Sequence, residues 1–148
     1  MNSLKNVRQK RRDTGDTYAS ATQSASMLAD SLQYRRRRIE ASDMIAIGEA
    51  AQLMGASRVT ISAWIKAGHC IGVSTPRRGV KLPRWQFDVG TWPVFQLLAS
   101  TLDTVDGWQL LAFMESASMA LDGKTPRSAL EEGVPVERIL AVATAWAH

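Results

Sequence analysis

The stretch from Ile47 to Gly68, IGEAAQLMGASRVTISAWIKAG, decides the fold of the chain around it. It predicts two short helices joined by a tight turn, because Gly55 suits a left-handed helix end and Ser57 suits the N-cap of the next helix. Small and apolar residues at helical spacing predict that the two helices pack together, with Ala51 at their closest approach. This pattern is typical of a helix-turn-helix.

The second helix of this pair is predicted to have an inner and an outer face. Ile61, Trp64 and Ile65 have the i, i+3, i+4 spacing of a core face. An outer stripe able to enter a DNA major groove consists of Arg58, Val59, Ser62 and Lys66. An ordinary helical hairpin with no role in DNA binding fits the same two helices, so the stretch that follows them matters.

A basic hairpin is predicted directly after this helix. Residues 70–75 and 80–85 read as strands around a turn at 76–79, and Pro83 implies that the returning strand lies at a sheet edge. Such a hairpin is a wing, whose cations are placed to meet phosphates or a minor groove: Arg77, Arg78, Lys81 and Arg84. Residues 44–47 predict a short strand that pairs with the wing or leads into the first helix. Trp85 and Phe87 are expected to pack on the helices.

Positive charge is concentrated in the first ninety residues. Residues 1–40 contain nine Lys and Arg against four Asp and Glu, and residues 41–90 contain six against three. Residues 91–148 reverse the balance, with three against seven. Residues 1–90 are therefore suited by their charge to bind a polyanion, and residues 91–148 are not.

The first 43 residues divide into two predicted segments. Residues 1–22 are polar and basic and are expected to form a flexible arm. Residues 23–43 have helical spacing and end near the basic run Arg35–Arg38, which predicts a helical arm or linker. Two interpretations stay open: an arm that adds phosphate contacts or helps dimerisation, and a solvated linker.

Residues 91–148 predict a compact helical unit. Pro93 favours a helix start near Trp92, Asp106 suits an N-cap, and Thr125 suits an N-cap followed by Pro126 at the first helical position. A last amphipathic helix after Pro135 is expected to bury a face made by Val136, Ile139, Leu140, Val142 and Ala143, closed by Trp146. The fold class is therefore predicted as mainly α: a winged helix-turn-helix with a small β-hairpin (residues 44–90), followed by a small helical bundle (residues 91–148).

The sequence gives little sign of catalysis. The two histidines, His69 and His148, lack partners at metal-ligand spacing, and Cys70 reads as a buried small residue. We expect no catalytic residues, no metal, no cofactor and no enzymatic activity. One cysteine, no leader-like segment and no long apolar run predict a cytoplasmic protein without a membrane interaction.

The stretch Leu121-Asp122-Gly123-Lys124-Thr125-Pro126, followed by Ala129-Leu130 and a final amphipathic helix, resembles the C-terminal toxin-binding domain of the Xre/MbcA/ParS antitoxins. The resemblance covers roughly residues 91–148. It implies a partner toxin of the NAD-consuming RES-domain type, whose active-site entrance the antitoxin covers. The covering residues would come from the last helix and tail, including Arg138, Val142, Trp146 and His148.

The front half resembles a different group, the excisionase and MerR-type winged helices, through Ser57–Ile61, Trp64–Gly68 and the hairpin that follows. Together these features indicate a type II antitoxin that neutralises its toxin, binds operator DNA and represses its own operon. A homodimer is expected, because one such unit buries too little surface for tight operator binding. The alternative is an excisionase-like or MerR-like regulator of a mobile element, with a C-terminal oligomerisation domain.

Overall fold

The computed structural model describes the backbone of residues 2–147 and the side chains of residues 21–147. The chain divides into two compact units, Met1–Arg38 and Ile39–His148. Helices predominate, and the second unit holds one small three-stranded antiparallel sheet. The prediction of a mainly α chain with a small β component is confirmed.

The described residues of the first unit belong to a single long helix, α1, which spans Asn2–Ile39. The sequence predicts a helix only over residues 23–43, so the observed helix begins earlier and ends four residues sooner. A turn follows it, in which the N–H of Met44 donates to the carbonyl of Ala41 at 3.1 Å. A role of residues 1–22 as a separate flexible arm stays a prediction.

The sheet contains β1 (Met44–Ala46), β2 (Val73–Thr75) and β3 (Arg78–Pro83) in the order β1-β3-β2. The prediction that residues 44–47 pair with the hairpin is confirmed, since Ile45 pairs with Leu82. Two details are wrong: the strands are shorter or shifted relative to 70–75 and 80–85, and β3 is the central strand. Pro83 is tolerated because it is the last residue of β3, where the ladder ends.

Helices α2 (Ile47–Met54) and α3 (Arg58–Ala67) form as predicted. Gly55 ends α2 in the left-handed region at φ 61°, and Gly68 ends α3 at φ 78°. The hydroxyl of Ser57 accepts the N–H of Thr60 at 3.1 Å and so caps α3. These local signals fix where both helices start and stop.

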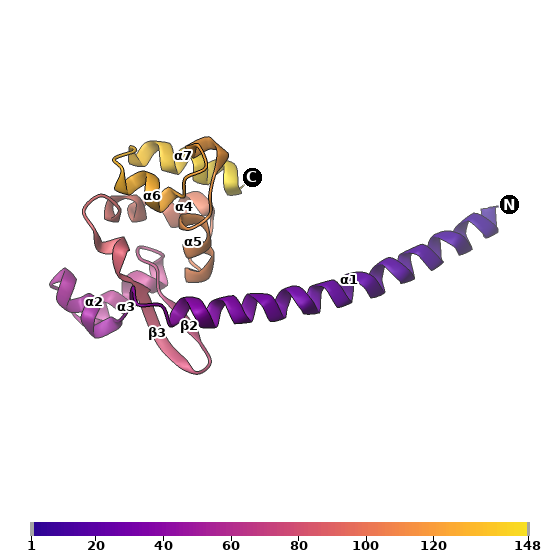
Figure 1. Cartoon of the computed structure of the whole chain (residues 1–148), viewed down its shortest axis with the longest axis horizontal. Coiled ribbons are helices and arrows are strands. Elements are labelled where there is room, and N and C mark those ends of the chain that lie inside the picture. Colours follow the sequence, from indigo (N-terminus) through magenta and orange to yellow (C-terminus); the bar gives the residue numbers. More distant parts are fainter. Residues whose placement is uncertain (1, 148) are drawn as a thin grey trace. The chain divides into compact units, whose positions relative to one another are not determined.

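The rest of the second unit is made of short helices. Two 3-10 helices, η1 and η2, precede α4. The helix start expected near Trp92 is confirmed, with Pro93 in the first turn, but this helix is a short 3-10 helix and an α-helix begins separately at Leu98. Figure 1 shows α4, α6 and α7 lying together. The bounds are η1 Arg84–Phe87, η2 Trp92–Gln96, α4 Leu98–Leu102, α5 Gly107–Met114, η3 Met119–Leu121, α6 Pro126–Glu131 and α7 Val136–Ala147.

Two apolar clusters hold the second unit together. The smaller one packs α2 on α3 and the sheet, with Ala50, Ile61 and Leu82 fully buried. The larger one joins the helices of residues 91–147 to Val73 and Trp85. The predictions that Trp85 and Phe87 pack on the helices and that Cys70 is buried are confirmed.

None of the helices in the described part of the chain combines the length and the apolar character that a membrane span requires.

Candidate nucleic-acid interface

The outer face of α3 is available for contact. Arg58, Val59 and Lys66 are exposed, with Val59 at 79%, and Ser62 is half-buried. Together with Ile47 and Ala63, these four residues line a shallow depression of about 420 Å³. The predicted stripe therefore lies together on one surface, because residues three and four apart share a helix face.

The inner face of α3 holds that surface in place. Ile61 is fully buried against α2, and Trp64 and Ile65 are partly buried in the same cluster. The indole of Trp64 also lies 5.7 Å from that of Trp92, centroid to centroid, at a tilt of 48°. Since Trp92 begins η2, this contact fixes the C-terminal end of α3 against the helical part of the unit.

Arg58 lies across the first turn of α2. A Cβ atom at Gly48 would come within 2.6 Å of the Arg58 Nη2 atom, so the absence of a side chain at Gly48 leaves room for the guanidinium. Sequence reasoning missed Gly48, because a close approach between side chain and backbone leaves no periodic signal. The glycine at the second position of α2 was the only hint.

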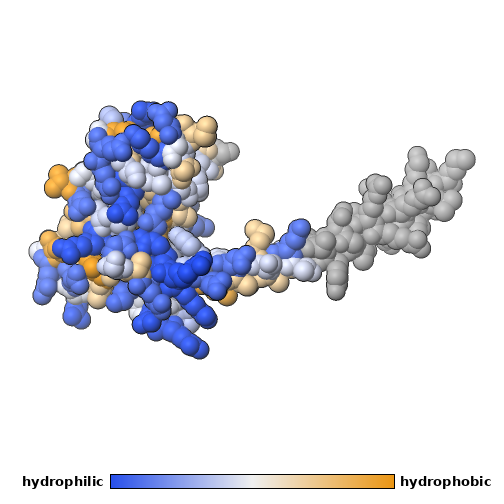
Figure 2. Space-filling view, in the orientation of Figure 1, coloured by the Kyte–Doolittle hydropathy of each residue, from blue (hydrophilic) through white to orange (hydrophobic). Residues whose placement is uncertain are grey.

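The hairpin between β2 and β3 carries the other predicted cations. The turn falls at Pro76–Arg77, and the side chains of Arg77 and Arg84 are exposed, while Lys81 is half-buried on β3. Arg78 belongs to β3 rather than to the tip, and it donates to Glu40 Oε1 at 2.8 Å. Figure 2 shows hydrophilic side chains covering this face around the hairpin.

The residues expected to bind a toxin are only partly gathered. Arg138 is exposed and donates to the carbonyl of Ala120 at 3.0 Å, and Trp146 is 54% exposed with its ring edge-on to Phe113. Val142 is half-buried and packs on the larger cluster. His148 lies outside the described residues.

The stretch that resembles the antitoxin motif is a turn followed by a capped helix. Gly123 has φ 83°, Leu121 and Leu130 are buried, and the hydroxyl of Thr125 accepts the N–H of Ser128 at 3.1 Å. The predicted N-cap of α6 is therefore confirmed. These residues shape the backbone that presents the neighbouring surface.

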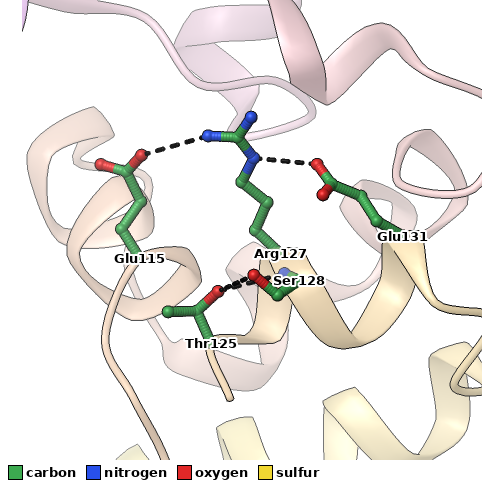
Figure 3. A network of polar contacts seen from close by, with 5 residues as sticks. All are labelled: Glu115, Thr125, Arg127, Ser128 and Glu131. Carbon is green, nitrogen blue, oxygen red and sulfur yellow. Dashed lines mark hydrogen bonds and ion pairs between the residues drawn. The ribbon is translucent and has the colours of Figure 1, made fainter.

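Arg127, in the middle of this stretch, is a contact residue that sequence reasoning missed. Its Nε donates to Glu131 at 2.9 Å, its Nη1 lies 3.9 Å from Glu115, and its guanidinium lies 4.8 Å from the centroid of the Trp85 ring. Figure 3 shows the two carboxylates on either side of this arginine. The spacing of Arg127 and Glu131 predicts their pair, but the contact with Trp85 spans 42 residues and has no local signal.

Two further observations concern chemistry. Burial raises the pKa of the Cys70 thiol to about 12, which keeps it protonated and unreactive. Within the described residues, no group of three or more His, Cys, Asp and Glu side chains is arranged to hold a metal ion.

Comparison with models of known protein families and with curated proteins gives no match. Among solved structures, a chain in the crystal structure of the M. tuberculosis MbcT-MbcA toxin-antitoxin complex is similar at 22% identity. The similarity covers 81% of this chain and 93% of that chain, with a TM-score of 0.33.

Proposed function

We propose that this chain is a DNA-binding antitoxin. Residues 44–90 act as a winged helix-turn-helix on operator DNA, and residues 91–148 bind and neutralise a RES-domain toxin. The observation that carries the proposal is the exposed stripe of α3, with Val59 at 79% exposure above a fully buried Ile61, followed directly by a basic hairpin.

In this proposal, α3 enters the major groove and reads bases. Arg58 and Lys66 suit guanine edges, Ser62 accepts or donates a hydrogen bond, and Val59 suits a thymine methyl group. Val59 is mostly exposed on a surface that also carries Arg58 and Lys66, and contact with such a methyl group gives this exposed apolar side chain a physical role.

The hairpin supplies backbone contacts. Arg77 at the turn and Arg84 after β3 carry exposed charges that suit phosphates, and Lys81 lies between them on β3. Arg78 contacts a phosphate only if its ion pair with Glu40 breaks, so it contributes less to DNA affinity than the other three cations of the hairpin. Two such units on paired half-sites give tight operator binding, and a homodimer bound at its own promoter represses the operon.

The toxin-binding part of the proposal rests on the C-terminal surface. Residues 91–148 carry net negative charge, and an exposed tryptophan at the end of α7 is the kind of aromatic anchor found at protein interfaces. Trp146 and Arg138 are both exposed on α7, and Arg138 also ties α7 to η3. This surface is proposed to cover the entrance of the toxin's active site.

A salt titration tests the DNA-binding half. Three cations of the hairpin, Arg77, Lys81 and Arg84, contact phosphates in this proposal, so log K should fall with log salt at a slope of roughly −3 for each bound chain. The measurement is fluorescence anisotropy with labelled promoter DNA over a range of salt concentrations. A slope near zero would contradict the proposal that this chain binds DNA.

Co-expression tests the toxin-binding half. The chain is expressed with the product of the adjacent reading frame, and complex formation and growth are measured. We expect a stable complex and restored growth, with Trp146→Ala weakening the complex and Lys124→Ala leaving it intact. No complex and no toxicity, together with an integrase in the adjacent frame, would favour an excisionase-like regulator instead.

A further inference from the structure

The apolar residues of α1 follow a heptad repeat. Alternate steps of three and four residues from Leu4 reach Ile39 through positions 7, 11, 14, 18, 21, 25, 28, 32 and 35, and we call these eleven positions the seam. Eight of the eleven are apolar, against four of the other twenty-seven positions of α1. A repeat with this spacing, sustained over five heptads, is typical of a helix that pairs with another helix.

The seam is exposed from Ala21 to Leu32, whereas Arg35 is half-buried and Ile39, at the C-terminal end of the seam, is buried in the larger apolar cluster of its own chain. Ala21 and Ala25 are exposed, and Leu28 and Leu32 are 62% and 49% exposed. Figure 2 shows hydrophobic side chains among hydrophilic ones on the described part of α1. A long helix gains most of its stability from covering its apolar stripe, and the part of the stripe from Ala21 to Leu32 lacks this cover in a single chain.

We propose that α1 pairs along the seam with α1 of a second copy of this chain, as a two-stranded coiled coil. Leu28 and Leu32 supply the largest described knobs, and Ala21 and Ala25 allow the helices to approach closely. Arg11, Thr14 and Arg35 interrupt the seam, and polar residues at such positions lower stability while fixing register and strand number.

The available area fits a reversible pair. The helical residues from Leu4 to Arg35, before the buried Ile39, span about 48 Å, and a contact strip about 10 Å wide buries roughly 480 Å² on each chain. The total of roughly 1,000 Å² lies at the low end of protein interfaces. A second copy supplies a seam of the same length and the same apolar character, so α1 of a second copy is the matching partner.

The charge of α1 makes this pairing dependent on salt. The helix contains nine Lys and Arg and three Asp, a net charge of +6, so two copies repel each other. Salt screens this repulsion and leaves apolar contact largely intact. Pairing should therefore strengthen as salt rises, whereas DNA binding weakens.

The test is sedimentation equilibrium of the full chain without DNA. The seam variant is Leu28→Glu with Leu32→Glu. Its matched control, Met27→Glu with Gln33→Glu, makes the same change of net charge at exposed positions off the seam. Circular dichroism checks the helix content of both variants.

We expect the wild-type chain to dimerise, and to do so more tightly when salt rises from about 0.1 M to about 0.5 M. The seam variant should raise the dissociation constant at least about tenfold, and the control should change it by less than about threefold. A monomeric wild type, equal losses in both variants, or a dimer that the seam variant leaves unchanged would each overturn the proposal. A chain that dimerises in this way but does not bind DNA would overturn the proposed function and leave the pairing intact.

Discussion

At the scale of single residues, Arg58 offers the sharpest test of base recognition. Its guanidinium lies against Gly48, the second residue of α2. If Arg58 contacts a base edge, Arg58→Ala weakens operator binding by about 1–3 kcal/mol and relaxes specificity at that base pair. Binding titrations on operator and random DNA measure both effects.

Lys124→Ala is the matched control for Arg58→Ala. It also removes one positive charge, but from an exposed ion pair with Glu132 in the C-terminal part of the unit. We expect its operator affinity to equal that of the wild type. Equal losses on operator and random DNA for Arg58→Ala would mean that Arg58 contacts only phosphate.

Cys70 gives a prediction about pH. Burial raises the pKa of its thiol from 9.0 to about 12, so the unfolded chain loses this proton at lower pH than the folded chain. The contribution to stability is complete below pH 9 and decreases as pH rises toward 12, by about 1.4 kcal/mol for each pH unit. Denaturant unfolding near pH 8 and near pH 10 measures it.

Cys70→Ala isolates the thiol from other groups that titrate in alkali. This variant loses packing at both pH values but has no thiol to ionise. The difference in unfolding free energy between wild type and variant should therefore shrink by about 1.4 kcal/mol between the two conditions. If the difference in unfolding free energy were the same at both pH values, the raised pKa of the Cys70 thiol would be contradicted.

At the scale of elements, the capped starts of helices were predictable and the positions of strands were not. Ser57, Asp106 and Thr125 each accept a backbone N–H of the next helical turn, as their sequence context predicts. Capping depends on a few adjacent residues, so the sequence carries the whole signal. The central place of β3 depends on pairing with β1, whose register is set by partners more than 30 residues away.

The same distinction applies to the candidate site. The stripe on α3 follows from helical periodicity, which is local. The pair of Arg78 with Glu40 joins residues 38 positions apart, and only the fold brings them together. Arg78, which the sequence predicted to be available for phosphate contact, is therefore held in an ion pair in the structure. The hairpin has one cation fewer for binding phosphates than the sequence predicted.

Glu40→Gln tests the ion pair between Glu40 and Arg78 at the hairpin. Both side chains are more than half exposed, so breaking the pair should change the free energy of unfolding by less than about 1 kcal/mol. The released Arg78 should raise DNA affinity and steepen the salt dependence by about one unit of slope. Anisotropy titrations at several salt concentrations measure both.

Glu132→Gln serves as the control for Glu40→Gln, since it releases Lys124 far along the chain with the same change of charge. Its DNA affinity should stay at the wild-type value. If both variants raised affinity equally, the effect would come from net charge and not from a freed Arg78.

At the scale of the whole molecule, the two proposed activities share one core. Val73 and Trp85 from the hairpin region lie in the same apolar cluster as Phe113 and Ile139 from the C-terminal helices. At the start of α5, a Cβ atom on Gly107 would come within 1.9 Å of the Gly72 carbonyl oxygen, so the backbones of the two regions are in close contact. The proposed DNA-binding and toxin-binding parts, which meet near residue 90, therefore do not form separate hydrophobic cores.

This shared core predicts that the second unit unfolds as one. A chain ending at Gly90 would expose Trp85 and Val73, which are 4% and 3% exposed in the full structure, and would lose their packing partners. We expect one cooperative transition for the full chain, with the same midpoint by tryptophan fluorescence and by circular dichroism. The truncated chain should show no cooperative transition and no specific DNA binding. Retention of the wild-type midpoint in residues 1–90 would mean that the winged part folds alone, and DNA binding would then be independent of the C-terminal helices.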